Sequence, residues 1–225
     1  MTRILLLSDP EHFGFFSSYL ATLPDVELAG TEADVIFDAG FLRPADKLER
    51  LSKIELRHPL IVTNTLTTTT TTVQAVLEGV NVIGIPMLPN YFARQKTLEF
   101  SFPFGKEGDK PQAESVIQAI GKTGENTQDS IAGVFPRTLA MIINEAAFAL
   151  QEGVATAIDI DTSMKLGTNY PKGPLAWCDE IGAPVIVAIL EALGKEYGTE
   201  RYKIASRLRM HAEARIPFHA SAPTP

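Results

Sequence analysis

The chain has 225 residues, enough to bury a core and to form one large domain or two small ones. Its 20 Lys and Arg residues against 27 Asp and Glu residues give a net charge of -7, and basic residues form no run, so nucleic acid and membrane surfaces are poor partners. Cys178 is the only cysteine and the four histidines are scattered, which excludes an internal disulfide and predicts no metal site. The apolar run near the amino terminus is too short for a signal peptide or a membrane span, and we expect a cytoplasmic protein.

Short apolar runs alternate with helical stretches through the first half of the chain. Strands are expected at residues 3–8, 26–30, 33–40, 59–65 and 81–87. Amphipathic stretches at residues 13–23, 45–56 and 73–80 predict the helices between them. Runs rich in Val and Ile, separated by helices, are typical of a parallel sheet covered on both faces, so the predicted fold class is α/β.

The second half of the chain changes character. A loop rich in Gly and Pro is expected at 102–112, followed by a helix over 113–124. From Asp129 onward the pattern is helical almost throughout, with helices expected over 137–155, 159–167, 183–198 and 201–214. Gly153 is the expected C-cap of the first of these helices, and Asp159 or Asp161 the expected N-cap of the second. We therefore predict an α/β domain over 1–128 and an all-α domain over 129–225.

Three pieces of the second half carry a family resemblance. INEAAFALQEGVA, then DID followed by MKLGTNYPKGPLAWCDEIG, then ILEAL resemble the C-terminal helical domain of the 3-hydroxyacyl-CoA dehydrogenase family in order and spacing. In the first half, TNTLTTTT, NVIGIPMLPN and KTLEF resemble further family segments, although helices and a strand normally present between VELAG and ADVIFDAG are lacking. The resemblance implies a shortened Rossmann domain that binds NAD, then a helical domain that dimerises and forms one wall of an acyl-CoA cleft.

The turn after the first strand departs from the family pattern. A dinucleotide site needs glycines there, because side chains block the diphosphate from the backbone N–H groups at the helix start. Residues 8–14 read SDPEHFG, so only Gly14 remains. Pro10 lacks an N–H donor, and Asp9 and Glu11 place negative charge where a diphosphate would lie. We expect NAD not to bind.

Two points about this turn stay open at the sequence level. The acidic residue that holds the ribose at the end of the second strand is missing, and Glu32 is the nearest candidate for that role. The turn also reads as a plain helix start, with Ser8 or Asp9 as N-cap and Pro10 in the first turn. We favour the helix start.

The resemblance also assigns the catalytic positions. In the family a histidine acts as general base and a glutamate orients it, a pairing suited to proton transfer near neutral pH. The histidine position is Pro86 in this chain, and Glu99 matches the glutamate with one additional residue between the two positions. Proline cannot accept a proton, so the expected base is missing.

Other polar positions of the family are changed as well. The family serine matches Leu66, with Thr67 beside it as a replacement hydroxyl, and the family asparagine in the second domain matches Pro136. Asn64 is retained. The candidate catalytic residues are therefore Glu99, Asn64 and Thr67.

Cationic residues near these segments are candidates for the phosphates of a thioester ligand. Arg94, Lys96 and Arg137 are the residues concerned. His12 is a further candidate because it lies in the altered turn, whereas the threonine run 67–72 is expected mainly to cap the following helix. Cys178, beside a tryptophan on an expected helix, predicts a buried thiol rather than a nucleophile.

Three functions are compatible with these residues. The first is an active NAD-dependent 3-hydroxyacyl-CoA dehydrogenase with displaced catalytic residues. The second, which we favour, is a relative without hydride transfer that binds an acyl-CoA-type ligand or pairs with an active paralogue. The third is new chemistry in the same cleft. In each case we expect a homodimer formed through the helical domain, because the helix at 183–198 is more apolar than a surface helix requires.

Overall fold

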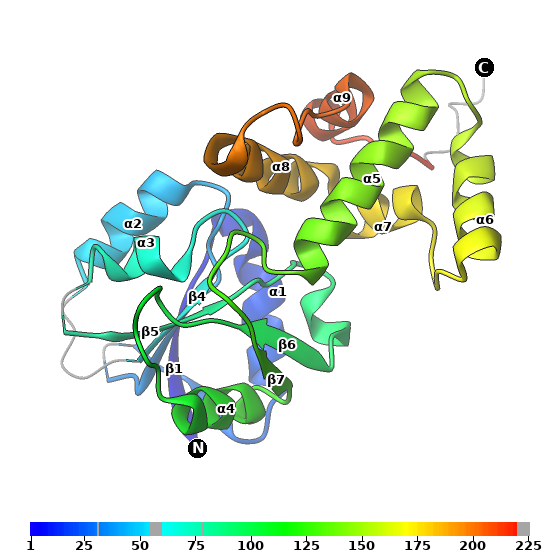
Figure 1. Ribbon diagram of the computed structural model, residues 1–225. Coiled ribbons are helices and arrows are strands. Elements are labelled where there is room, and N and C mark those ends of the chain that lie inside the picture. Colours follow the sequence, from blue (N-terminus) through cyan, green and yellow to red (C-terminus); the bar gives the residue numbers. More distant parts are fainter. Residues whose placement is uncertain (31, 55–59, 78, 220–225) are drawn as a thin grey trace. The chain divides into compact units, whose positions relative to one another are not determined.

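The computed structural model describes residues 1–30, 32–54, 60–77 and 79–219 (Figure 1). The chain forms two compact units, Met1–Val134 and Phe135–Pro225. The boundary expected after residue 128 lies in the segment that leads into the first helix of the second unit. His58, expected to open a strand, lies outside the described residues.

The first unit is built on a parallel five-stranded sheet, as the sequence predicted. Its strands are β1 (Thr2–Leu7), β2 (Val26–Leu28), β3 (Val35–Asp38), β4 (Leu60–Asn64) and β5 (Asn81–Ile85), in the order β2-β1-β3-β4-β5. All four strand pairs are parallel. Every residue of β3 and β4 is buried, which explains why these runs are apolar on both faces.

Helices cover both faces of this sheet (Figure 1). They are α1 (Pro10–Ala21), α2 (Pro44–Ser52) and α3 (Thr70–Gln74). Alternate residues of β3 point to opposite faces: Phe37 packs with Phe16 and Phe92 in one core cluster, and Ile36 packs with Leu51 in the other. The amphipathic helices thus bury their apolar sides against the sheet.

The segment after β5 contains a shorter helix than the one predicted over 113–124, followed by a strand that was not predicted. It contains the short helix η1 (Phe92–Arg94), strand β6 (Thr97–Phe100), helix α4 (Lys110–Ala119) and strand β7 (Thr123–Asn126). The helix ends early because Gly121 adopts φ +74, a left-handed conformation typical of helix C-termini. The chain then pairs β7 with β6 in parallel, and an antiparallel bridge between Gly84 and Ser101 links β5 to the segment that follows β6.

The second unit is helical, as predicted. It contains α5 (Phe135–Gln151), α6 (Ala157–Thr168), α7 (Pro174–Ile181), α8 (Ala183–Tyr197) and α9 (Ser206–Ala214). Gly153, with φ +70, follows α5 as the expected C-cap. The N-cap of α6 is Thr156, whose hydroxyl accepts from Asp159 N at 3.2 Å, so the expectation of Asp159 or Asp161 as N-cap was wrong.

Asp161 has a different structural role. Its carboxylate accepts hydrogen bonds from Leu175 N (2.8 Å) and Ala176 N (2.9 Å), and so caps α7 rather than its own helix. A Cβ on Gly173 would lie 2.1 Å from the Asp161 carboxyl carbon, so this position requires glycine. Among the described residues, no helix is long and apolar enough to cross a membrane.

Candidate functional site

The turn between β1 and α1 is a helix start, as favoured from the sequence. Helix α1 begins at Pro10 with Asp9 as N-cap residue, but the Asp9 side chain makes no hydrogen bond to its own helix. Its Oδ2 instead accepts from Phe41 N (2.7 Å) and Leu42 N (3.0 Å), in the loop after β3. Gly14 lies inside α1, outside the turn, and a Cβ there would meet open space. The Asp9 carboxylate, which the sequence placed in this turn, is therefore hydrogen-bonded to backbone amides of the loop after β3.

A buried charged cluster lies where β3 ends, and the sequence analysis missed it. The Asp38 carboxylate pairs with Lys47 Nζ at 3.1 Å and Arg50 at 3.0 Å, and accepts from the Thr63 hydroxyl at 2.8 Å. Lys47 is 1% exposed and also donates to the Asn64 carbonyl. Burial lowers the pKa of the Lys47 amine, and the carboxylate of Asp38 opposes this shift.

Sequence signals for this cluster were present. An aspartate ends the buried run VIFD, and Lys47 is one helical turn from Leu51, on the buried side of an amphipathic helix. A charged residue on each of two buried surfaces predicts an ion pair between them, because an unpaired buried charge is too costly.

Asn64 occupies the end of β4 with all its hydrogen-bonding capacity used. Its amide donates to Ala39 O (3.1 Å) and Met87 O (3.0 Å), and its Oδ1 accepts from Leu66 N (3.1 Å) and Met87 N (3.0 Å). The side chain thus joins the loops that follow β3, β4 and β5. This is a positioning role, and no donor or acceptor remains for a substrate carbonyl.

The threonine run caps α3, as expected. The Thr69 hydroxyl accepts from Thr72 N at 3.0 Å, and the Asp129 carboxylate accepts from Thr70 N and Thr71 N, each at 2.8 Å. The Thr67 hydroxyl donates to Phe41 O at 2.5 Å. The hydroxyls and amides of this turn are therefore largely used within the protein.

Pro86 and Glu99, the positions that the resemblance assigns to the base and its partner, both lie close to Gly133. Glu99 lies on β6, and its Oε2 accepts from Val134 N at 2.5 Å. A Cβ on Gly133, which has φ +54, would lie 2.4 Å from Glu99 Oε2 and 2.9 Å from Pro86 Cγ. The Glu99 carboxylate therefore accepts from a backbone amide, and Pro86 lies close to the same glycine.

The remaining candidates of the first unit are His12, Arg94, Lys96 and Glu32, and they do not form one cluster. The His12 ring lies 5.2 Å from the Phe41 ring, and burial lowers the pKa of His12. Arg94 is in η1, and both Arg94 and Lys96 are exposed. Glu32 is exposed between β2 and β3, and its charge contributes to the raised pKa of Arg3, whose main cause is Asp34. Glu32 therefore lies near the amino-terminal part of β1, whereas dinucleotides bind at the carboxyl ends of strands.

The second unit holds Pro136 and Arg137 at the start of α5. Pro136 is buried. The Arg137 guanidinium donates to the Tyr202 hydroxyl at 2.5 Å and lies 4.5 Å from the centre of the Tyr197 ring. This aromatic enclosure joins α5 to the end of α8 through a cation–π contact and a hydrogen bond.

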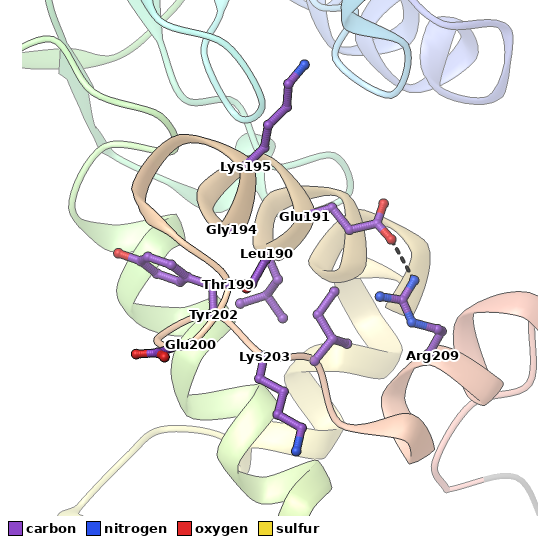
Figure 2. A pocket seen from close by; sticks show the side chains of 10 residues that line it. Leu190, Glu191, Gly194, Lys195, Thr199, Glu200, Tyr202, Lys203 and Arg209 are labelled. Atoms are coloured by element: carbon purple, nitrogen blue, oxygen red, sulfur yellow. Dashed lines mark hydrogen bonds and ion pairs between the residues drawn. The ribbon is translucent and has the colours of Figure 1, made fainter.

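A groove of about 630 Å³ lies in the helical unit, at α8 and the segment leading into α9 (Figure 2). Leu190 and Tyr202 line it, and a 2.6 Å ion pair joins Glu191 to Arg209. The residues lining the groove include no histidine or cysteine, so it offers no thiol nucleophile. Cys178 is buried, as predicted, and burial raises the pKa of its thiol. The described part of the chain has no group of three His, Cys, Asp or Glu suited to a metal ion.

The two units define a class of protein: a Rossmann-like α/β domain, shorter than a full dinucleotide-binding domain, followed by a helical domain. Residues 133–217 match the model of the 3-hydroxyacyl-CoA dehydrogenase C-terminal domain. The helical unit therefore belongs to the C-terminal domain of the 3-hydroxyacyl-CoA dehydrogenase family, and the chain as a whole is similar to members of that family.

Individual relatives agree with this assignment. The chain is 51% identical over 96 residues to 3-hydroxyadipyl-CoA dehydrogenase of Escherichia coli, a match that covers 43% of this chain and 20% of that protein. It is 32% identical to a probable 3-hydroxybutyryl-CoA dehydrogenase of Bacillus subtilis, over 81% of this chain and 65% of that one. The crystal structure of (S)-3-hydroxybutyryl-CoA dehydrogenase PaaH1 from Ralstonia eutropha superposes with a TM-score of 0.70 at 26% identity, covering 84% and 70% of the two chains. The chain spans less than two thirds of the length of these two curated relatives.

Proposed function

We propose that this protein binds an acyl-CoA-type thioester and does not carry out hydride transfer, acting as a ligand binder or as the partner of an active paralogue. The names of its relatives share an acyl-CoA substrate, and we propose that this protein binds such a ligand without oxidising or reducing it. The observation that carries this proposal is the proline at position 86, where the resemblance expects the catalytic histidine, with Pro86 and Glu99 both close to Gly133.

Hydride transfer from a 3-hydroxyl requires a group that removes the hydroxyl proton. The residue at the expected histidine position is Pro86, whose side chain has no titratable atom, and the Glu99 carboxylate accepts from Val134 N. Loss of a general base reduces the rate by about 10²–10⁴-fold. Asn64 has no free donor or acceptor, and Leu66 stands at the position of a family hydroxyl, so neither residue can bind a substrate carbonyl.

NAD belongs to the family's chemistry, and we propose that this chain does not hold it. In the turn after β1, Pro10 lacks an N–H donor. The Asp9 carboxylate in the same turn accepts from Phe41 N of the loop after β3. These groups do not fit a diphosphate, because they repel its charge and offer few free donors.

Thermal unfolding with separate additions of NAD, NADH, CoA and acetoacetyl-CoA tests the proposal. We expect acetoacetyl-CoA to raise Tm and NADH to leave it unchanged, since a ligand at about 100 times its Kd stabilises by about 2.7 kcal/mol. An Arg94→Ala/Lys96→Ala variant is expected to weaken the response to CoA, with the exposed Lys106→Ala as matched control. NADH consumption with acetoacetyl-CoA would overturn the proposal and favour an active dehydrogenase with displaced catalytic residues. If the protein converts a thioester without NADH, and if Glu99→Gln abolishes this activity, the result would favour a different reaction in the same cleft.

We also propose a homodimer formed through the helical unit. Helix α6 exposes Ile158 (67%) and Leu166 (81%), which lie about two turns apart on one face, and Val154 just before the helix is 71% exposed. Exposed apolar side chains aligned in this way favour a self-complementary contact about a two-fold axis.

Light scattering after size exclusion tests the dimer. The unchanged protein is expected at twice the monomer mass, and Ile158→Glu/Leu166→Glu at the monomer mass with an unchanged circular dichroism spectrum. Phe104→Glu is the matched control, because this exposed phenylalanine belongs to the other unit. A monomeric unchanged protein, or a variant that still dimerises, would contradict the use of this face.

A further inference from the structure

The crevice between the carboxyl ends of β1 and β3 is the ligand-binding position of this sheet topology. β1 connects through α1 to β2 on one side, while the chain continues through β3, β4 and β5 on the other. Open α/β sheets bind ligands where the strand order reverses in this way. The residues that follow β1 and β3 therefore decide what can enter.

Asp9 reaches across this crevice. It follows β1, is 5% exposed, and its Oδ2 accepts from two consecutive amides that follow β3, Phe41 N at 2.7 Å and Leu42 N at 3.0 Å. Two backbone N–H groups that converge on one oxygen are what such loops offer to an anionic ligand. In this protein the anion is part of the chain.

The charged side chains near Asp9 and Gly40 are balanced. A Cβ on Gly40 would lie 2.7 Å from an Arg50 guanidinium nitrogen, 3.4 Å from Asp38 Oδ1 and 3.6 Å from Asp9 N. Asp9 and Asp38 supply two negative charges, and Lys47 and Arg50 supply two positive charges. These four side chains are balanced in charge, and a side chain at position 40 would collide with Arg50.

A second carboxylate accepts from two consecutive backbone amides in the segment that follows β4. After β4, the amides of Thr70 and Thr71 both donate to the Asp129 carboxylate at 2.8 Å. Backbone donors at the edge of the sheet are thus taken by internal carboxylates in two places.

We propose that Asp9 is an internal anion that permanently occupies the ligand crevice of the Rossmann-like unit, in the place of a dinucleotide diphosphate. The amides of Phe41 and Leu42 form a latent site for a small carboxylate, which becomes accessible when the Asp9 side chain is removed. This assignment does not depend on thioester binding, so a failed CoA titration leaves it unaffected.

Anion rescue of Asp9→Ala tests the proposal. We expect the variant to lose about 5–10 °C in Tm, because two buried amides lose their acceptor. Sodium formate is expected to restore more than half of this loss relative to sodium chloride at the same concentration. The unchanged protein and Asp25→Ala, which removes an exposed carboxylate of the same unit, should respond equally to the two salts. Asp9→Asn should retain most of the stability, since its Oδ1 can accept both bonds.

Three results would overturn the proposal: an Asp9→Ala variant as stable as the unchanged protein, equal responses of this variant to formate and chloride, or stabilisation of the unchanged protein by NADH. If Asp9→Ala does not fold, hydrogen exchange of the unchanged protein decides the question. The Phe41 and Leu42 amides should be protected without any ligand, and exchange at the rate of exposed amides would exclude the Asp9 contact.

Discussion

Replacement of Lys47 by alanine is expected to lower the free energy of unfolding by about 3–5 kcal/mol, because it removes one partner of a buried ion pair. Lys47 and Asp38 are 1% and 0% exposed, with 3.1 Å between Nζ and Oδ2. Without the ammonium group, Asp38 keeps Arg50 and Thr63, but the Asn64 carbonyl loses a donor and a cavity forms. Urea unfolding followed by circular dichroism measures the loss.

Two further variants separate the charge effect from the volume effect. Lys53→Ala removes an exposed pair with Glu49, whose side chains are 69% and 65% exposed, and serves as the control with little or no loss. Asp38→Asn/Lys47→Met removes both charges while keeping similar volumes, and is expected to recover part of the stability lost in Lys47→Ala. Equal stability of Lys47→Ala and Lys53→Ala would show that the buried pair has no stabilising role.

Replacement of Asn144 by alanine is expected to cost about 2–5 kcal/mol in the helical unit, since two backbone groups lose their partner. Asn144 lies on α5 and is 4% exposed. Its amide donates to Lys203 O at 2.8 Å and its Oδ1 accepts from Ala205 N at 3.0 Å, which holds the segment before α9.

The measurement can follow this unit specifically. Trp177 is the only tryptophan and belongs to α7, so its fluorescence during urea unfolding reports on the helical unit. Glu145→Ala, at the adjacent exposed position of α5, is the matched control with a change within about 0.5 kcal/mol. A loss in Asn144→Ala no larger than in this control would contradict the role assigned to the side chain.

Sequence reasoning located most elements because their signals are local. The Val- and Ile-rich runs identified all five strands of the parallel sheet, and the periodic apolar faces identified the main helices. It failed over 113–124, where α4 ends before Gly121 and β7 begins at Thr123. It also misplaced the helix expected over 73–80, because α3 spans Thr70–Gln74. The residues TGEN have little β character of their own, and they form a strand because β6 lies beside them as a pairing partner.

Periodicity, motif order and residue identity are enough to predict the α/β and helical architecture, the family resemblance and the absence of a titratable side chain at Pro86. The partners of the remaining polar residues become visible only in the folded protein. Asp9 contacts Phe41 and Leu42, Asp38 contacts Lys47, and Asn64 contacts Met87, all across different loops. A carboxylate or an amide binds whichever donors and acceptors the fold brings within about 3 Å, and that proximity is a property of strand order rather than of local sequence.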